Sequence, residues 1–166
     1  MKKYVFLLIV TVFAYVSCAS GQKTEAPIVQ SSMSPQLVKA QNDQLDKVPV
    51  GGFEYKGSNV PAQKWDKWSK AAAPIVKEII AKLPQGYVLE IAGHTDARGP
   101  EQADGDKKGN IAISEERANS VLASLKKAGI TSDRIRAKGY GSSKPLEGVD
   151  TKDNAQRRVT FQVVEQ

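Results

Sequence analysis

The chain has 166 residues and a formal charge of +6, and 40% of its residues are apolar and 25% charged. These values are ordinary for one folded domain with an appendage and exclude a chain that is disordered throughout. One cysteine excludes a disulfide framework, and one histidine excludes a tetrahedral metal site of Cys and His. The basic residues are scattered without an aromatic–basic cluster, so we discount nucleic acid as a partner despite the positive charge.

The N-terminus is typical of a secretory signal peptide, which we assign to residues 1–17. Lys2 and Lys3 form a short positive region, and residues 4–16 follow as an uncharged run rich in Val, Leu, Ile and Phe. A membrane-spanning helix needs about 20 such residues. The run is shorter than that, which favours a cleaved signal over a transmembrane anchor.

Cys18, the single cysteine, lies directly after this run. Cleavage before Cys18 by a lipoprotein-type signal peptidase makes it the lipid-bearing first residue, whereas ordinary cleavage after Ala19 or Ser20 discards it. Its position favours lipidation, although Tyr15 stands where the usual recognition sequence has an aliphatic residue. Several acyl chains on Cys18 would hold the protein stably on a membrane.

Residues 18–49 are rich in Gln, Ser, Pro, Lys and Asp and show no sustained hydrophobic period. Such a segment buries too little apolar surface to offset its ordering entropy. We therefore expect a lipidated N-terminus followed by a flexible tether. Within the tether, residues 36–45 could form a short helix. The folded domain is expected over residues 50–166.

Six elements are expected in this domain. Alternating aromatic residues predict a strand over 51–55, and helical spacing of apolar residues predicts a helix over 62–83, which Pro74 kinks or divides. Trp65 and Trp68 lie on the apolar face of that helix, and we expect them in the core. Residues 87–93 form the strongest strand pattern of the chain.

The second half of the domain adds a helix and two strands. Ser114 is the expected N-cap of the helix, and Gly129 suits its C-terminus. The last two strands are expected over 134–138 and 158–164. The resulting βαβαββ order predicts an α/β two-layer sandwich, with helices packed on one face of a mixed four-stranded sheet.

Two charged residues suggest a binding site after the central strand. Asp96 follows the carboxyl end of this strand, where open α/β sheets commonly place ligands. Arg117 lies three residues after the expected helix cap, where a cation opposes the helix dipole. It is either a surface arginine paired with a nearby acid such as Glu115 or Glu116, or the partner of a ligand carboxylate. In the second case Asp96 could bind the ammonium group of the same zwitterion.

The motifs around these two residues resemble a known signature. They are Ile91-Ala92-Gly93-His94-Thr95-Asp96, Gly99, Asn110, Ile113-Ser114, Arg117-Ala118, Gly139-Tyr140-Gly141, Pro145 and Arg157-Arg158-Val159. In this order they resemble the OmpA-like peptidoglycan-binding domain family, over residues 50–166, and with a lipidated N-terminus its peptidoglycan-associated lipoprotein type. Ten residues separate Gly99 from Asn110, six more than in the family pattern. We expect the surplus to form an extruded loop.

The resemblance implies a ligand, the diaminopimelate of peptidoglycan stem peptides. Asp96 would bind its ammonium group and Arg117 its free carboxylate. The supporting contacts that it implies are Asn110, the backbone around Thr95 and Ala97, and one of Arg157 and Arg158. Strand alternation places these two arginines on opposite sides, so the other one is expected to face solvent.

The resemblance also implies a non-catalytic lipoprotein that ties the outer membrane to the cell wall, with its domain in the periplasm and without a cofactor or metal. The alternatives are a surface-exposed adhesin that binds host or matrix protein with the same fold, and a cell-wall hydrolase. His94 beside Asp96 pairs a base with a carboxylate, but no Ser or Cys nucleophile motif accompanies it, so we interpret His94 as structural. Asp104-Gly105-Asp106 lacks the third ligand of a calcium loop, because Lys108 occupies that position.

Overall fold

The computed structural model describes residues 34–166. The predicted signal peptide and Cys18 lie outside this range. The elements are α1 (Pro35–Leu45), β1 (Val50–Gly51), α2 (Ala62–Ala71), α3 (Ala73–Lys82), β2 (Tyr87–Gly93), α4 (Asn110–Lys127), β3 (Ile135–Gly139), the short 3-10 helix η1 (Asn154–Gln156) and β4 (Arg158–Glu165). Within residues 34–166, no helix combines the length and apolar character needed to cross a bilayer.

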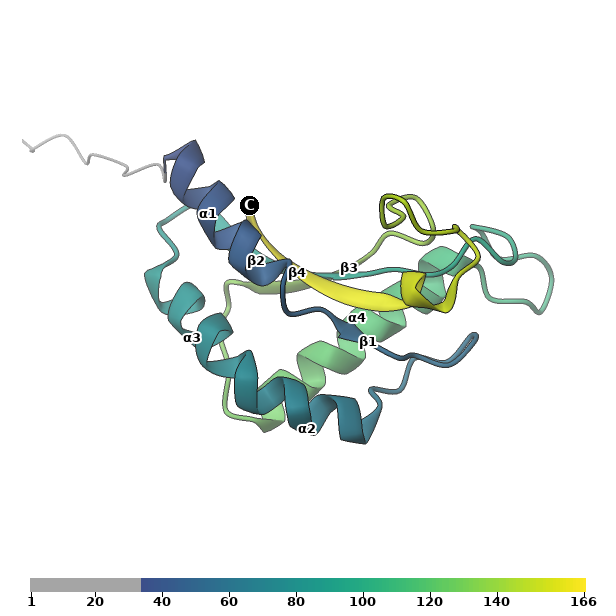
Figure 1. Ribbon diagram of the computed structural model, residues 1–166, viewed down its shortest axis with the longest axis horizontal. Helices are drawn as coiled ribbons and strands as arrows, with labels where there is room; N and C mark the ends of the chain where they lie inside the picture. The colour runs from purple at the N-terminus through teal and green to yellow at the C-terminus, as the bar shows by residue number, and fades with distance from the viewer. Residues whose placement is uncertain (1–33) are drawn as a thin grey trace, which may run out of the picture.

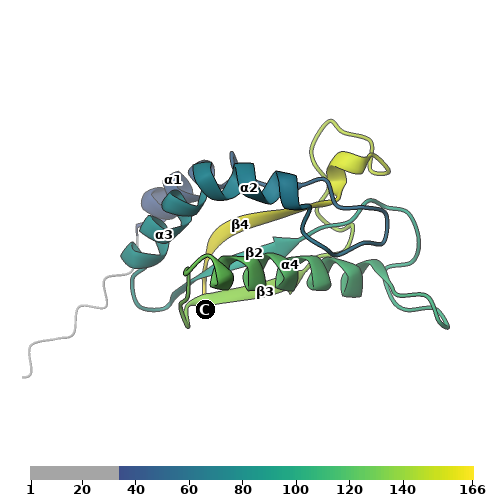
Figure 2. The same ribbon diagram turned by 90° about the horizontal axis from the view of Figure 1, so that it is seen from below.

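The four strands form one mixed sheet in the order β1-β4-β2-β3. β2 and β3 run parallel, whereas β4 is antiparallel to both β2 and β1. Figures 1 and 2 show α2, α3 and α4 on the same side of this sheet. The predicted α/β sandwich, with helices on one face of a mixed four-stranded sheet, is therefore confirmed.

The core lies between the sheet and these helices. Val159, Phe161 and Val163 alternate along β4 and are all buried. Trp68 of α2 stacks on Phe161 with a ring-centroid distance of 5.1 Å. Trp65 stacks in turn on Trp68 at 4.9 Å and is only half-buried. The predicted core role of the two tryptophans is confirmed, with Trp68 as the central one.

Two breaks in regular structure follow from proline and glycine. α2 ends before Ala72, and Pro74 lies in the first turn of α3. An N–H in this turn has no partner within the helix, so a proline costs no helical hydrogen bond there. Pro74 therefore divides the helix, as predicted. Gly52 has a φ of 87°, which turns the chain away from β4. The predicted strand over 51–55 is thus too long, although Phe53 remains buried.

α4 begins five residues earlier than predicted, with Gly109 at its N-cap in place of Ser114. Ser114 lies inside the helix, where its hydroxyl donates to the carbonyl of Ile111 (2.7 Å) and accepts from the N–H of Gly141 (2.9 Å). The prediction of Ser114 as the cap is wrong, because its hydroxyl accepts from Gly141 in the loop after β3 and not from an N–H at the start of the helix. Arg117 consequently lies two turns inside α4, and the helix dipole does not explain its role.

α1 is packed against the domain, within the range predicted as a flexible tether. Asn42 pairs with both backbone groups of Val163, donating from Nδ2 to its carbonyl (3.2 Å) and accepting from its N–H at Oδ1 (2.7 Å). It thereby covers the edge of β4 past Val159, where the pairing with β1 stops. Leu45 is fully buried. The packed region thus begins near Pro35, and the predicted boundary at Val50 is too late.

Leu45→Ala is expected to lower the free energy of unfolding by about 2–5 kcal/mol, because it removes a fully buried leucine from the core. Leu37→Ala is the matched control on the same helix, since Leu37 is 50% exposed. Urea unfolding of both variants tests whether α1 belongs to the folded unit. Equal stability of the two variants would show that α1 contributes no core packing.

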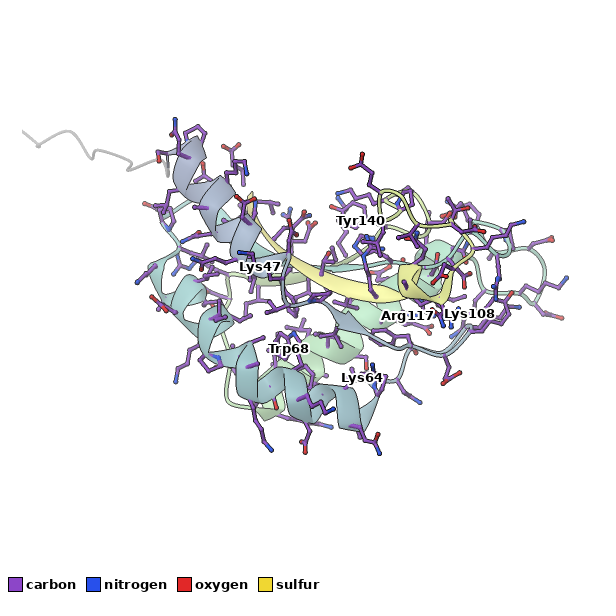
Figure 3. The ribbon with its side chains drawn as sticks, viewed as in Figure 1. Lys47, Lys64, Trp68, Lys108, Arg117 and Tyr140 are labelled. Carbon is purple, nitrogen blue, oxygen red and sulfur yellow. The ribbon has the colours of Figure 1, made fainter. Side chains whose placement is uncertain are left out.

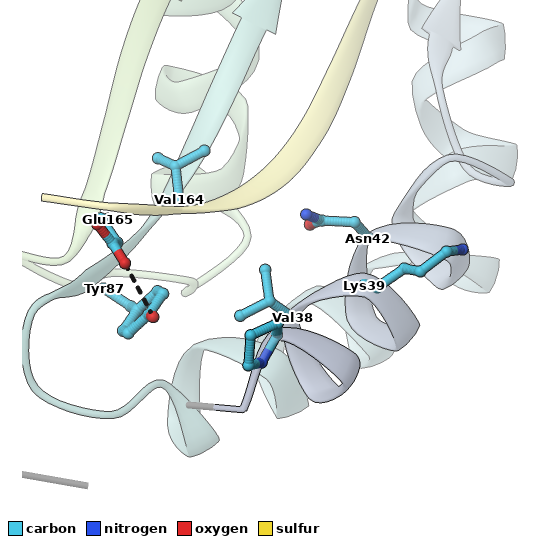
Figure 4. Close-up of a pocket in the computed structure, with 7 residues that line it drawn as sticks. Val38, Lys39, Asn42, Tyr87, Val164 and Glu165 are labelled. Atoms are coloured by element: carbon cyan, nitrogen blue, oxygen red, sulfur yellow. Dashed lines mark hydrogen bonds between the residues drawn. The ribbon is translucent and has the colours of Figure 1, made fainter. Parts of the chain in front are cut away.

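A pocket of about 420 Å³ lies between the first turns of α1 and the end of the sheet where β2 starts (Figure 4). Val38, Asn42 and Tyr87 line it, and the hydroxyl of Tyr87 donates to the Glu165 carboxylate at 3.3 Å. Because Asp96 follows the opposite end of β2, this pocket is separate from the candidate site.

Candidate functional site

Glycines at the ends of β2 and β3 bring α4 into direct contact with the sheet. A Cβ atom on Gly93 would lie 1.9 Å from the carbonyl oxygen of Ser114, and one on Gly139 would lie 2.6 Å from that of Ile111. Neither position tolerates a side chain without movement of the helix backbone. This close approach places Arg117 beneath the carboxyl end of β2, where Figure 3 shows it.

Arg117 is only 1% exposed and donates three hydrogen bonds to backbone carbonyls. Nη1 donates to His94 (2.8 Å), Nε to Gly57 (2.8 Å) and Nη2 to Glu54 (2.9 Å). Its guanidinium carbon lies 5.3 Å from the centroid of the Phe53 ring. The interpretation of Arg117 as a surface residue paired with a nearby acid is therefore wrong.

The charge of Arg117 is retained at neutral pH. Burial, and secondarily the positive charge of Arg157, lower the pKa of Arg117 to about 10, while the negative charge of Asp96 acts in the opposite direction. Arg117, Arg157 and Asp96 thus place two cations and one anion close together. An additional negative group would be favoured there electrostatically.

Asp96 is also buried, at 2% exposure. Its Oδ2 accepts from Nη1 of Arg157 (2.8 Å), and its Oδ1 accepts from the backbone N–H of Arg98 (3.2 Å). Arg157 additionally donates from Nε to the carbonyl of Phe53 (2.8 Å). A carboxylate has about four lone-pair positions, so Asp96 keeps acceptor capacity beyond these two bonds.

Arg157 and Arg158 point to opposite sides, as strand alternation predicts. Arg157 is the one that joins Asp96, whereas Arg158 donates to the carbonyls of Gln156 and Lys144. Arg158 is only 8% exposed, so the expectation that the second arginine faces solvent is wrong. The polar carbonyls of the loop before β4 account for its burial.

The structure brings several of the predicted site residues onto one small pocket of about 10 Å³. Its lining residues are Tyr55, Lys56, Thr95, Asp96, Asn110, Ile113, Arg117 and Arg157. The hydroxyl of Thr95 is buried there without a hydrogen-bond partner among the described residues. Tyr55 and Lys56 were not predicted as site residues, since Tyr55 was assigned to the strand expected over 51–55, which ends at Gly51 in the structure.

Two predicted supporting residues have structural partners instead. The side-chain amide of Asn110 donates to the carbonyl of Gly99 (3.4 Å) and to the carboxylate of Glu101 (3.2 Å). The N–H of Ala97 donates to the carbonyl of Thr151 (2.8 Å), and Ala97 does not line the pocket. Both residues hold the loops that surround Asp96.

The surplus residues between Gly99 and Asn110 extend away from the sheet as a loop (Figure 1). Backbone bonds close its base, from Asn110 to Pro100 (2.9 Å) and from Ile111 to Glu101 (3.1 Å). The Glu101 carboxylate also accepts from the N–H of Ser142 (3.2 Å). The insertion is thus tied to the loop after β3, and Asp96 and Arg117 on either side of it still line one pocket.

His94 is buried between β4 and Tyr140. Its Nε2 lies 3.0 Å from the hydroxyl of Thr160, and its ring stacks on Tyr140 at a centroid distance of 5.8 Å. Burial, followed by the positive charges of Arg158 and Lys144, lowers the pKa of His94 to about 3. A neutral, enclosed imidazole fits the structural role that we expected.

The low pKa of His94 predicts a loss of stability in acid. His94 takes up a proton near pH 6.5 in the unfolded chain but only near pH 3 in the folded chain. Its contribution to the free energy of unfolding is therefore complete above pH 6.5 and is lost as the pH falls toward 3. In this window we expect the free energy of unfolding of the wild type to fall by up to about 1.4 kcal/mol per pH unit more than that of His94→Gln. Urea unfolding between pH 7 and pH 4 measures this. Parallel slopes for the two proteins would contradict the buried neutral state.

The comparison with known protein families agrees with this geometry. The model described as "OmpA family" matches residues 53–158, which is more than half of the chain. The chain belongs to the OmpA family. The matched range contains α2, α3, β2, α4 and β3, and it reaches the first residue of β4.

Individual OmpA-family relatives show how far the similarity extends. A peptidoglycan-associated lipoprotein of Legionella pneumophila is 39% identical over 82 residues, which are 48% of this chain and 43% of that protein. The outer-membrane lipoprotein YfiB of Pseudomonas aeruginosa is 28% identical over 91% of this chain and 86% of its own length. The crystal structure of the peptidoglycan-associated lipoprotein from Burkholderia pseudomallei superposes with a TM-score of 0.55 at 25% identity, covering 72% of this chain and 92% of that one. The chain thus spans less than half of the Legionella relative.

Proposed function

We propose that this chain is a non-catalytic outer-membrane lipoprotein whose OmpA-family domain binds the diaminopimelate of peptidoglycan stem peptides and so ties the membrane to the cell wall. One observation carries the proposal. Asp96 and Arg117, which are 21 residues apart in the sequence, line the same small pocket and carry opposite charges. Relatives named peptidoglycan-associated lipoprotein support peptidoglycan as the partner.

The chemistry of the ligand fits these two residues. The side chain of diaminopimelate ends in an ammonium group and a carboxylate on one carbon atom. Asp96 binds the ammonium group, and the planar guanidinium of Arg117 binds the carboxylate through two parallel hydrogen bonds. The hydroxyl of Thr95, which has no hydrogen-bond partner within residues 34–166, is a third polar contact, and Arg157 holds Asp96 in position.

The remaining predicted contacts act indirectly in this proposal. Asn110 and Ala97 fix the loops around the pocket through bonds that they already make. Arg158 lies on the other side of β4 and takes no part in binding.

Cys18 carries the lipid anchor in this proposal, and the domain faces the wall from the periplasmic side. Fifteen residues separate Cys18 from Ser34, the first described residue. Fully extended, that length spans about 50 Å. Incorporation of a labelled fatty acid into the wild type, and its absence from Cys18→Ser, tests the anchor.

Sedimentation with purified diaminopimelate-type peptidoglycan tests the proposed function. The wild-type protein is expected to sediment with the wall material and to release no soluble muropeptides. If the protein stays in the supernatant, the proposal is wrong. Release of muropeptides would instead support a hydrolase, and protease sensitivity of the domain on intact cells would support the adhesin alternative.

A further inference from the structure

The candidate site is covered by a short turn of the chain, formed by residues 54–57. The N–H of Gly57 donates to the carbonyl of Glu54 (3.0 Å), which closes the turn. Lys56 adopts a φ of 57°, the only non-glycine residue in the described part of the chain with a positive φ. We refer to this segment as the 54–57 turn.

The arginines of the site hold the 54–57 turn in place. Arg117 donates from Nε to Gly57 (2.8 Å) and from Nη2 to Glu54 (2.9 Å), both carbonyls of the turn. Nε and Nη2 form a fork that binds both oxygens of a carboxylate in a bidentate pair. The two carbonyl oxygens therefore occupy positions that the two oxygens of a bound carboxylate would need. Arg157 adds a bond to the residue that precedes the turn, at the carbonyl of Phe53 (2.8 Å).

The space left beneath the turn is too small for the ligand. The pocket measures about 10 Å³, whereas even a single water molecule needs about 10–15 Å³. Tyr55 and Lys56 of the turn line this pocket together with Asp96 and Arg117. An ammonium group and a carboxylate can reach these two residues only after the turn has moved.

The turn is built to move without unfolding the domain. Phe53 on one side is buried in the core, and α2 begins at Ala62 on the other side. Between these anchors Tyr55 is 48% exposed and Lys56 is also exposed. The left-handed backbone of Lys56 is strained for a residue with a side chain, which weakens the closed state. The bond from Nη1 of Arg117 to His94 (2.8 Å) does not involve the turn and keeps the guanidinium in place when the turn leaves.

We propose that the 54–57 turn is an internal competitor of the ligand: its carbonyl groups occupy Arg117 in the free protein, and a diaminopimelate carboxylate must displace them to bind. This inference rests on the proposed function. The apparent dissociation constant is then the intrinsic dissociation constant of the open site divided by the fraction of molecules in which the turn is open.

A fluorophore on the turn tests this displacement directly. Tyr55→Cys in a Cys18→Ser background of the secreted chain provides a single thiol for an environment-sensitive label. The protein is titrated with the stem tripeptide L-alanyl-D-glutamyl-meso-diaminopimelate, and calorimetry on the same sample measures binding independently. We expect the label emission to change in step with the binding heat. Binding with a silent label would overturn the competitor alone, whereas no binding heat in the unlabelled wild type would overturn the proposed function and the competitor with it.

A second pair of variants shifts the balance between the closed and open turn. A Cβ atom on Gly57 would lie 3.1 Å from Cβ of Glu54, so Gly57→Ala crowds the closed turn. Gly51→Ala is the matched control, because the added atom meets nothing within 4 Å. Gly57→Ala is expected to tighten the apparent affinity for the tripeptide by about two- to tenfold. An affinity equal to or weaker than that of Gly51→Ala would contradict the competitor.

Discussion

Asp96→Asn is expected to weaken binding of a diaminopimelate stem peptide by about 30-fold or more, which corresponds to a loss of at least about 2 kcal/mol. The substitution keeps the size of the side chain and an acceptor for the N–H of Arg98, but it removes the charge that would pair with the ligand ammonium group. It also leaves the partly buried Arg157 without its counter-ion. The unpaired cation then repels the ammonium group.

Asp66→Asn is the control for this variant, because Asp66 is an exposed acid on α2. It changes the net charge by the same amount away from the site. Isothermal titration with the stem tripeptide measures both variants beside the wild type. If Asp96→Asn binds within twofold of Asp66→Asn, Asp96 is not a ligand contact, even if the domain binds the wall.

Arg117→Ala is expected to lower the free energy of unfolding by about 2–4 kcal/mol and to abolish binding. Its three hydrogen bonds join α4 to the end of β2 and to the 54–57 turn. The carbonyls of the turn can rehydrate when the turn opens, but the buried carbonyl of His94 loses a charged donor. A cavity also opens beside Phe53, because Arg117 is fully buried.

Arg117→Lys separates the two roles of this residue. A lysine keeps the positive charge but lacks the planar fork, so it cannot serve the carbonyls and a ligand carboxylate in the same geometry. We expect it to recover part of the stability and little of the binding. Lys126→Ala, at an exposed position on the same helix, is the control. Urea unfolding of Arg117→Ala within about 0.5 kcal/mol of this control would contradict the structural role.

The fold was predictable where local pattern and tertiary packing agree. β2 and β4 carry apolar residues in register, and Pro74 divides the helix as its chemistry requires. α1 was not predicted as part of the domain, because its sequence is mostly polar. Its docking depends on Leu45 and on the pairing of Asn42 with a strand edge 121 residues away.

Glu90 shows why burial of a charged residue escapes sequence patterns. It lies in the middle of β2 and is only 1% exposed, with hydrogen bonds from Tyr140 (2.5 Å), Arg136 (2.9 Å) and Gln162 (2.7 Å). Burial raises the pKa of Glu90, but these hydrogen bonds outweigh it and bring the net pKa below 4.5. The partners come from β3, β4 and the loop after β3, so no local pattern indicates them.

The residues of the candidate site could be predicted from the sequence, but the 54–57 turn that covers the site could not. Asp96 was identified by its place after the central strand and Arg117 by the family motif around it, and alternation along β4 predicted that only one of Arg157 and Arg158 would join them. Which arginine joins is decided by the register of β4 against β2. The closed 54–57 turn could not be predicted, because it depends on backbone carbonyls, which have the same chemistry at every residue.

We expect the site to recognise both charged groups at the end of diaminopimelate. Calorimetric titration of the wild-type protein with two stem tripeptides, one ending in meso-diaminopimelate and one in L-lysine, tests this expectation. Lysine keeps the ammonium group for Asp96 but lacks the carboxylate for Arg117. We expect the diaminopimelate peptide to bind at least about tenfold more tightly. Without the carboxylate, the lysine peptide leaves the buried cation of Arg117 without an anionic partner. Equal affinities for the two peptides would contradict the assignment of Arg117 as the carboxylate-binding residue.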